Sequence, residues 1–288
     1  MTNKNTTKNI SIEKLFPFEG HPFKVQDNEE MNALIESIQE QGILSPLIVR
    51  PKENTSDEYE IVSGHRRFRA AVKAGIKEVP ALIVPLDRDE AAIAVVDSNL
   101  HREHILPSEK AFAYKLKMEA LSRQGKRTDL TSTQVVSKLR SNEIIGQSTD
   151  ESRETVRRYI RLTNLIPPIL DMVDEGRIAF TPAVELSYLN QIEQTDLLAE
   201  IQISDATPNL SQSQRLRAIS AKDGLTPEII AEIICEEKAN QREMFKLPME
   251  QLRKYAPKAN PKQMQDLVIK ALDHYTRYLQ RQRDRDSR

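Results

Sequence analysis

Apolar positions along residues 9–105 follow two different periods. Four apolar residues recur at helical spacing between Met31 and Ile38, with Gly42 after them, and this spacing predicts a helix. Short β-branched or apolar runs, which are typical of strands, follow at 47–49, 59–62 and 79–84. Helical spacing returns over residues 91–100. Alternating helix and strand signals predict a small α/β domain that is large enough to hold a nucleotide.

Strand signals end at Pro107, and the rest of the chain has helical spacing. Residues 134–139 form a short amphipathic stretch, and a polar turn follows around Gly146. Residues 152–162 form a second stretch, with apolar residues on one side and arginines on the other. Two short helices joined in this way predict a helix-turn-helix, although the loop is longer than the usual three or four residues. We therefore expect an all-α domain over 106–203 and an α+β fold class overall.

The two ends of the chain differ from these domains in composition. Residues 1–8 are polar and predict a disordered tail, and residues 204–225, which are richer in Ser, Gln, Asn and Pro, predict a linker. In the remaining segment, 226–288, a helix is expected over 226–238 and a second one near the end of the chain. Its longest helix is expected over 262–280, where seven apolar residues follow one stripe: Met264, Leu267, Val268, Ala271, Leu272, Tyr275 and Leu279. A stripe of that length needs a surface to cover it, so we expect this segment to dimerise.

Composition limits the class of protein. The chain has 288 residues, which favours two or three domains. No apolar run approaches the roughly 20 residues that cross a bilayer, and the N-terminus lacks the apolar segment of a signal peptide. The single cysteine, Cys235, cannot form an internal disulfide and is expected to be a buried, inert thiol. These features predict a cytoplasmic protein that does not enter a membrane.

Positive charge is concentrated in the middle of a neutral chain. The net charge is −1, but residues 115–163 carry 11 Lys or Arg against six Asp or Glu. A basic segment of this kind is a modest indication of phosphate binding.

Residues 61–70, Ile-Val-Ser-Gly-His-Arg-Arg-Phe-Arg-Ala, carry the first candidate site. A strand, a glycine turn and the start of a helix aim backbone N–H groups and the positive end of a helix dipole at an anion. Arginines there add forked hydrogen bonds to phosphate oxygens. The alternative is an ordinary strand-to-helix turn whose arginines lie on a solvated face.

Three segments together resemble the ParB partition-protein family over about residues 8–190. Gly64–Ala70 resembles the family box Gly-Glu-Arg-Arg-x-Arg-Ala, and Ser98–Glu103 resembles Glu-Asn-Leu-Gln-Arg-Glu. Pro107–Ala111 follows the second box as the family tail does, and Gly42–Arg50 resembles the first box of the family. The segments occur in the family order.

This resemblance implies a ParB/sulfiredoxin-like N-terminal domain that binds CTP with Mg²⁺ and closes a dimer into a clamp around DNA. Carried over by position, the implied nucleotide-binding residues are Ser45, Gly64, His65, Arg66, Arg67, Asn99 and Arg102. Asn99 is also the implied metal-binding residue.

Two departures from the family pattern affect the chemistry. His65 replaces a glutamate in the phosphate loop, and Ser98 replaces the glutamate that contacts magnesium. A serine hydroxyl is a weak substitute for a carboxylate as a magnesium ligand. Asp97 is one residue earlier, which turns it about 100° away on a helix. The sequence therefore predicts nucleotide binding and leaves hydrolysis, by a weak CTPase at most, open.

The same scaffold also occurs in sulfiredoxin-like enzymes, whose phosphate loop carries a catalytic cysteine. Cys235 lies far from the loop in sequence, so this redox chemistry, which needs a thiolate at the loop, is discarded.

The second stretch of the predicted helix-turn-helix carries the candidate DNA-binding residues: Ser152, Arg153, Thr155, Arg157, Arg158 and Arg161. The N-terminal residues of a recognition helix face base edges, so Arg153 is the first candidate for guanine contact. Arg157 and Arg158 are expected on phosphates. For each arginine taken singly, a solvated basic face is the alternative.

We expect a ParB-like, site-specific DNA-binding protein that acts as a CTP-controlled clamp in plasmid or chromosome segregation. It would be a cytoplasmic, nucleoid-associated homodimer on a palindromic double-stranded site, served by a ParA-type Walker ATPase. One alternative is a helix-turn-helix transcriptional regulator with a degenerate nucleotide domain, and another is an enzyme of the same superfamily that transfers phosphoryl groups. Ser98 favours the regulator. Four residues favour the CTP-controlled clamp: Arg66, Arg67, Asn99 and Arg102.

Overall fold

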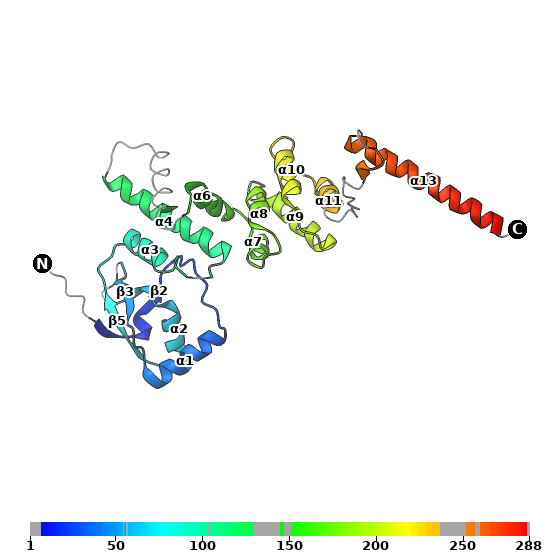
Figure 1. Ribbon diagram of the computed structural model, residues 1–288. Helices are drawn as coiled ribbons and strands as arrows, with labels where there is room; N and C mark the ends of the chain where they lie inside the picture. The colour runs from blue at the N-terminus through cyan, green and yellow to red at the C-terminus, as the bar shows by residue number, and fades with distance from the viewer. Residues whose placement is uncertain are drawn as a thin grey trace. The chain divides into compact units, whose positions relative to one another are not determined.

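The computed structural model describes residues 7–53, 55, 57–102, 104–128, 145–146, 151–236, 252–256 and 260–286 (Figure 1). The chain divides into two units, Met1–Cys235 and Glu236–Arg288. The first unit contains a mixed sheet followed by helices, which confirms the predicted α+β fold class.

Within the described residues, five strands form one sheet in the order β1-β5-β3-β4-β2. Strand β1 (Thr7–Ser11) pairs antiparallel with β5 (Glu78–Ile83), which lies parallel to β3 (Leu47–Pro51). Strand β3 pairs antiparallel with β4 (Tyr59–Ser63), which lies parallel to β2 (Leu15–Pro17). A short 3-10 helix, η1 (Ile12–Lys14), joins β1 to β2. The predicted strands at 47–49, 59–62 and 79–84 are therefore confirmed.

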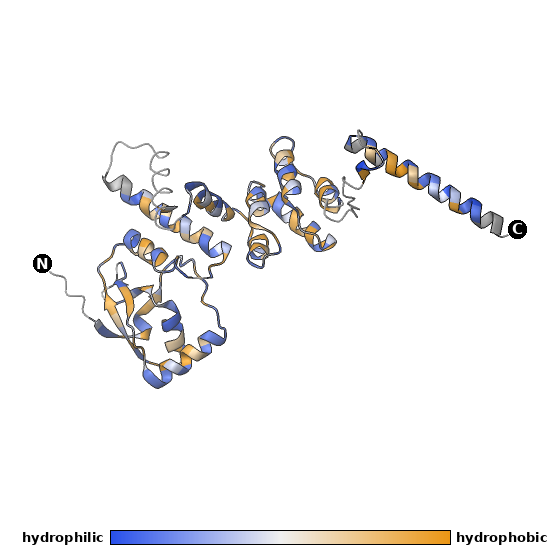
Figure 2. Cartoon of the chain, in the orientation of Figure 1, coloured by the Kyte–Doolittle hydropathy of each residue, from blue (hydrophilic) through white to orange (hydrophobic). Residues whose placement is uncertain are grey.

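Helices cover this sheet. Helix α1 (Glu29–Gln41) packs against α2 (His65–Lys73), and both contribute to a cluster of buried residues around Met31 and Ala70. The buried strand residues, which include Leu47 and Ile61, form the core of the sheet, and Figure 2 shows apolar residues along the strands. Burial of these β-branched and aliphatic side chains is the main stabilising term of the domain.

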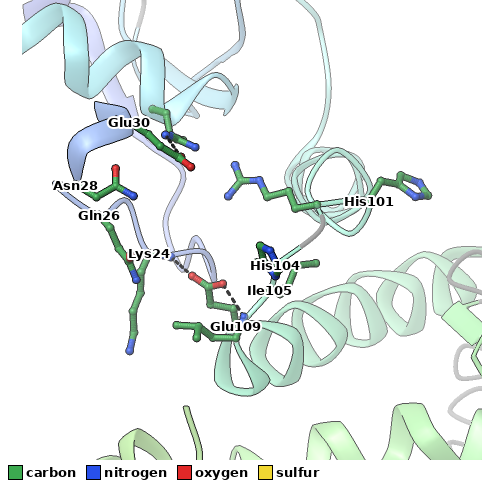
Figure 3. A pocket seen from close by; sticks show the side chains of 11 residues that line it. Lys24, Gln26, Asn28, Glu30, His101, His104, Ile105 and Glu109 are labelled. Carbon is green, nitrogen blue, oxygen red and sulfur yellow. Dashed lines mark hydrogen bonds and ion pairs between the residues drawn. The ribbon is translucent and has the colours of Figure 1, made fainter. Parts of the chain in front are cut away.

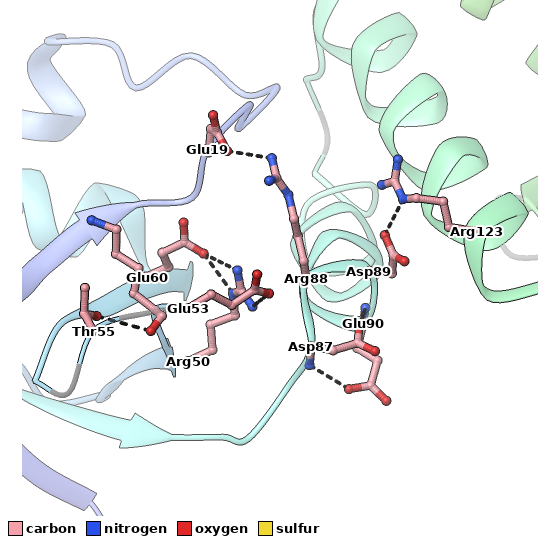
Figure 4. A network of polar contacts seen from close by, with 11 residues as sticks. Glu19, Arg50, Glu53, Thr55, Glu60, Asp87, Arg88, Asp89, Glu90 and Arg123 are labelled. Atoms are coloured by element: carbon pink, nitrogen blue, oxygen red, sulfur yellow. Dashed lines mark hydrogen bonds and ion pairs between the residues drawn. The ribbon is translucent and has the colours of Figure 1, made fainter. Parts of the chain in front are cut away.

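Helix α3 (Arg88–Asp97) joins the sheet to the helical part of the chain. Its first turn is closed by a capping box between Asp87 and Glu90. Arg88 pairs with Glu19 at 2.6 Å, and Asp89 accepts a 2.7 Å hydrogen bond from Arg123 on the next helix, α4 (Pro107–Thr128) (Figure 4). These contacts orient α3 between the sheet and α4.

The helices that follow share one core. They are α6 (Arg153–Leu162), α7 (Pro167–Asp174), α8 (Phe180–Leu186), α9 (Gln191–Ser204), α10 (Leu210–Ser220) and α11 (Pro227–Cys235). Leu162, Ile169, Leu197 and Leu216 are fully buried among them. This confirms helical structure after Pro107. The predicted first helix of the helix-turn-helix, 134–139, lies outside the described residues.

The expected linker at 204–225 does not match the structure, because α10 lies inside it. Leu216 is buried, and the side chain of Gln212 donates to the carbonyl of Ile233 on α11 at 2.6 Å. Asn209 and Gln212 form a capping box at the start of α10. The Ser, Gln and Asn content that suggested a linker instead supplies a helix cap and buried hydrogen bonds.

Two smaller expectations also change. Thr7 and Lys8, assigned to the disordered tail, lie in β1 and pair with β5, while residues 1–6 lie outside the described part. Cys235, expected to be buried, is exposed.

In the second unit, α13 (Pro261–Asp286) confirms the long helix predicted over 262–280. The side chain of Asn260 caps it by accepting from the backbone N–H of Gln263 at 2.8 Å. Among the helices of the described residues, none is both long enough and apolar enough to cross a membrane.

Candidate functional site

The turn between β4 and α2 requires glycine. Gly64 has φ 103°, a conformation that side chains rarely adopt. A Cβ at this position would lie 3.2 Å from both the Leu47 side chain and the Arg67 guanidinium. Gly64 is the N-cap of α2 and has no side chain to satisfy the first N–H groups of the helix. The turn thus presents backbone donors and the positive end of the helix dipole beside three arginines.

A pocket of about 910 Å³ lies next to this turn. Five basic or imidazole side chains line it: Lys24, Arg66, His101, Arg102 and His104. Two carboxylates, Glu30 and Glu109, also line it. Figure 3 shows Asn28 and Glu30 on one side of the pocket, and Glu109, near Lys24, on α4. Ligand pockets typically have volumes of about 300–1,000 Å³, so the space suits a nucleotide.

Arg66 and Arg102, two of the predicted nucleotide-binding residues, line this pocket. Arg66 donates to Glu30 at 2.9 Å, so its charge is paired in the absence of a ligand. The Arg102 guanidinium lies 5.6 Å from the centre of the Phe23 ring. Removal from solvent lowers the pKa of Arg102, and the charge of Arg66 lowers it further, against the opposing effect of Glu109. Two cations close enough to affect each other favour an anionic ligand.

Arg67 and Ser45 contact each other rather than the pocket. The Arg67 guanidinium donates to the carbonyl oxygens of Ser45 and of Pro46, the latter at 2.9 Å. Burial lowers the pKa of Arg67. Neither Arg67 nor Ser45 lines the pocket described above. In this state Arg67 fastens the segment before β3 to the start of α2.

Asn99 is buried and its amide is engaged by its own helix. The Nδ2 group donates to the carbonyl of Val95 at 2.7 Å and to the hydroxyl of Ser98 at 3.2 Å. Asp97 pairs with Lys117 on α4 at 2.5 Å, and the Lys117 side chain is only 3% exposed. Asp97 is therefore engaged with a buried lysine. In the part of the chain that the structure describes, no group of three or more His, Cys, Asp or Glu residues could hold a metal ion.

His65, the remaining predicted residue of the turn, packs on a histidine from another segment. Its ring lies 3.7 Å from the ring of His21, measured between centroids. Burial, followed by the proximity of His21 and Arg102, lowers the pKa of His65 to about 3. His65 is therefore a neutral side chain near pH 7.

Sequence reasoning missed most of the pocket. Lys24, Glu30, His101, His104 and Glu109 come from three separate segments. The histidines and Glu109 lie in or beside the second family-like box, so proximity in sequence could have suggested them. Lys24 had no such signal, because its place in the pocket depends on contacts with residues 85 positions away.

The predicted recognition helix is α6. Ser152 is its N-cap, and its side chain accepts from the backbone N–H of Thr155 at 3.1 Å. Arg153 and Arg157 are exposed, and Arg157 lies 3.4 Å from Glu154. Buried Val156 holds the opposite face of the helix in the core. The first turn of α6 thus exposes its polar residues.

Arg158 and Arg161 instead contact α8 and the residues that follow it. Arg158 donates to the Thr181 hydroxyl at 3.0 Å and lies 4.9 Å from the Phe180 ring centre. Arg161 donates to the Ser187 carbonyl at 3.3 Å and lies 3.8 Å from the Tyr188 ring centre. The six DNA-binding candidates therefore fall into two groups: four toward the N-terminus, of which Ser152, Arg153 and Arg157 are exposed, and two arginines that join helices.

Comparisons with known proteins agree with this architecture. Residues 1–100 match the family model described as the ParB N-terminal domain. The probable chromosome 1-partitioning protein ParB of Deinococcus radiodurans is 35% identical over 209 residues, which cover 72% of this chain and 64% of that protein. The nucleoid occlusion protein of Listeria innocua is 30% identical over 194 residues, covering 67% of this chain and 62% of that protein. The chain thus spans less than two thirds of the length of these relatives.

Among solved structures, this chain is similar to the C-terminally truncated chromosome-partitioning protein ParB from Caulobacter crescentus complexed to the centromeric parS site. The sequence identity is 25% and the TM-score is 0.42, with 73% of this chain and 98% of that chain covered.

Proposed function

The chain belongs to the ParB partition-protein family, and from this premise we propose that it binds DNA at a specific site and acts in segregation as a CTP-controlled clamp. The DNA served is that of a plasmid, a mobile element or a chromosome. The protein is cytoplasmic and associated with the nucleoid, and a ParA-type Walker ATPase is its partner.

One observation carries the nucleotide part of this proposal. Arg66 in the first turn of α2, Arg102 and Lys24 line one pocket next to the start of that helix. A triphosphate tail carries several negative charges, and helix N-termini and guanidinium groups are the groups that bind phosphate oxygens well. The choice of cytidine rests on the resemblance of Gly64–Ala70 and Ser98–Glu103 to the family boxes.

Magnesium is the expected companion of the triphosphate, with Asn99 as its candidate protein contact. Its Nδ2 group donates to the Val95 carbonyl, so only the side-chain oxygen is left for such a contact, and in this state the buried Asn99 does not line the pocket. Mg²⁺ typically keeps several waters and takes one or two carboxylates besides substrate phosphates, and Ser98 offers none. Bound magnesium would neutralise charge on the phosphates, while Arg66 and Arg102 orient them.

The DNA part of the proposal rests on α6. Exposed Ser152, Arg153 and Arg157 at its first turns suit insertion into a major groove. A homodimer would present two copies of this helix and so would read a palindromic double-stranded site.

The second unit supports the homodimer. An apolar groove along α13 is lined by Tyr255, Leu267, Leu272 and Tyr275, among others. Tyr255 is 82% exposed, Leu272 61% and Tyr275 57%. Burial of such residues against a second copy would remove a continuous apolar surface from water.

A site-specific transcriptional regulator is the second candidate. It is favoured by the engagement of Asn99 within α3 and by Ser98 in place of a carboxylate. In that case α6 binds an operator, and the pocket has no triphosphate ligand.

Titration calorimetry with the four ribonucleoside triphosphates, each with Mg²⁺ and with or without cognate DNA, separates the two candidates. Of the four triphosphates, we expect only CTP to give saturable heat. Cognate DNA is obtained beforehand by selection from random duplexes, and a palindromic consensus is expected. Absence of selective heat for any triphosphate, with DNA binding retained, would replace the clamp by the regulator.

A further inference from the structure

The Lys24 side chain contacts both the pocket and helix α7. It lines the pocket with Arg66 and Arg102. Its ammonium group also lies 3.6 Å from a carboxylate oxygen of Asp171 and 3.6 Å from one of Asp174, both on α7. The backbone N–H of Lys24 donates to Glu109 on α4 at 2.7 Å, so the backbone is fixed while the side chain lies between the pocket and α7.

The two aspartates differ in how firmly they are held. Asp174 accepts from the backbone N–H and the hydroxyl of Ser108, at 2.9 and 2.5 Å, and its side chain is 8% exposed. The Asp171 side chain is 60% exposed, and its partner is the Lys24 ammonium. Asp174 is therefore part of the α4–α7 packing, whereas Asp171 interacts with Lys24 alone among the contacts that the structure records for its side chain.

Both distances to Lys24 exceed the 2.7–2.9 Å of a charge-assisted hydrogen bond. The Lys24–Asp171 pair is exposed, and exposed ion pairs stabilise a protein only weakly. A polyphosphate in the adjacent pocket carries more negative charge than either carboxylate. The lysine side chain is flexible enough to turn from the carboxylates toward such a ligand.

We propose that Lys24 is a phosphate-binding residue of this pocket and that Asp171 competes with the ligand for it. This inference rests on the proposed nucleotide binding. When polyphosphate binds, the Lys24 ammonium moves from α7 to the ligand, and the ion pair between the pocket and α7 is lost. Because coupling between two equilibria is reciprocal, the state of α7 then also sets the affinity of the pocket.

The test compares four forms of the full chain: the unchanged protein, Asp171→Asn, Lys24→Met and the double variant. Calorimetry measures the affinity for CTP with Mg²⁺ and for inorganic tripolyphosphate, near physiological salt. Asp171→Asn should tighten binding of both ligands about 2- to 5-fold, as expected for release of an exposed pair. Lys24→Met should weaken binding about 10-fold or more.

Two features of the result decide the test: the direction of the Asp171→Asn effect on affinity, and whether this effect depends on Lys24. In the Lys24→Met background, Asp171→Asn should have no effect on affinity. Glu175→Gln removes a charge from an exposed residue at the end of the same helix and is the matched control, which should leave affinity unchanged. Lys24→Arg should restore most of the affinity, and thermal unfolding of each variant checks that the fold is kept.

Two results would overturn the inference: no tightening in Asp171→Asn, or the same tightening in the absence of Lys24. Failure of the unchanged protein to bind either ligand is distinguishable from both, since it removes the proposed nucleotide binding itself.

Discussion

The imidazole rings of His21 and His65 pack against each other at a tilt, with centroids 3.7 Å apart and planes inclined by 38°. The Nδ1 atom of His21 lies 2.9 Å from the Phe23 carbonyl, which requires a proton on that nitrogen. Both Nε2 atoms are buried and have no partner within the described residues. Burial lowers the pKa of each histidine, that of His65 to about 3. Both rings are therefore neutral near pH 7, and ring contact, not charge, joins the segment before α1 to the turn between β4 and α2.

This arrangement predicts that the free energy of unfolding decreases as the pH is lowered. The pKa of His65 is about 6.5 in the unfolded chain and about 3 in the folded protein. Between these values the unfolded chain binds a proton at His65 and the folded protein does not, so stability rises with pH in this range. The free energy of unfolding should fall by up to about 1.4 kcal/mol for each pH unit below 6.5 on account of this group. Urea unfolding at several pH values between 7.5 and 5, compared with His65→Gln, measures it.

The variant should show a shallower decline than the unchanged protein. His101→Gln, which alters an exposed histidine, is the control and should keep the original slope. Equal slopes for His65→Gln and the unchanged protein would mean that His65 titrates normally.

Arg66 and Arg67 are adjacent in sequence but should give opposite phenotypes. Arg66→Ala should weaken nucleotide binding by about 1.5–3 kcal/mol, because it removes a charge-assisted contact in the pocket, and should leave stability nearly unchanged. Arg67→Ala should lower the free energy of unfolding by about 1–3 kcal/mol, because the Ser45 and Pro46 carbonyls lose their donor. Calorimetry and urea unfolding on both variants distinguish binding from folding. Identical effects of the two variants on both measurements would contradict this division.

Local sequence patterns predicted the fold better than they predicted the residues of the candidate site. The helix over Met31–Ile38 and the strands around Leu47 and Ile61 were predictable, because apolar period and side-chain burial are properties of short segments. The segment around Leu216 was not, since polar residues that cap a helix resemble those of a linker. The place of Lys24 was also out of reach, because it depends on α4 and α7 packing against a distant loop.

The candidate residues show the same limit. Resemblance gave Arg66 and Arg67 the same role, yet their side chains leave α2 in different directions and contact different segments. On α6, helical spacing alone could not tell exposed Arg157 from Arg158, whose partners lie on α8.

Ser98→Glu should strengthen the dependence of nucleotide binding on Mg²⁺. The substitution supplies a carboxylate beside Asn99, and hard cations prefer such ligands. Asp97 cannot take this role without leaving Lys117, a buried cation. We expect tighter binding of CTP with Mg²⁺ and unchanged binding in excess chelator, both measured by calorimetry. Ser98→Gln is the matched control, and an equal gain from it would assign the effect to size rather than charge.

Removal of α13 should abolish the dimer. A chain ending at Asn260 lacks the exposed apolar residues Leu272 and Tyr275. Multi-angle light scattering at micromolar concentration should report a dimer for the full chain and a monomer for the shortened one. A dimer in both would place the interface in the first unit.

Arg153 and Arg157 should separate reading of the DNA sequence from binding of its backbone. Arg153 lies in the first turn of α6, where side chains reach base edges, so Arg153→Ala should cost roughly 1–3 kcal/mol on the cognate site and relax discrimination. Arg157 lies one turn later and is exposed, so Arg157→Ala should weaken cognate and scrambled duplexes about equally. It should also reduce the salt dependence by about one ion.

Arg158→Ala is the internal comparison for these two variants. Its guanidinium contacts Thr181 and Phe180, so its removal should lower thermal stability without changing the slope of affinity against salt. Binding titrations of the three variants on both duplexes, at several salt concentrations, decide between these roles. Equal losses for Arg153→Ala on cognate and scrambled DNA would exclude α6 as the helix that reads the bases, because a residue that contacts only phosphates cannot distinguish the two duplexes.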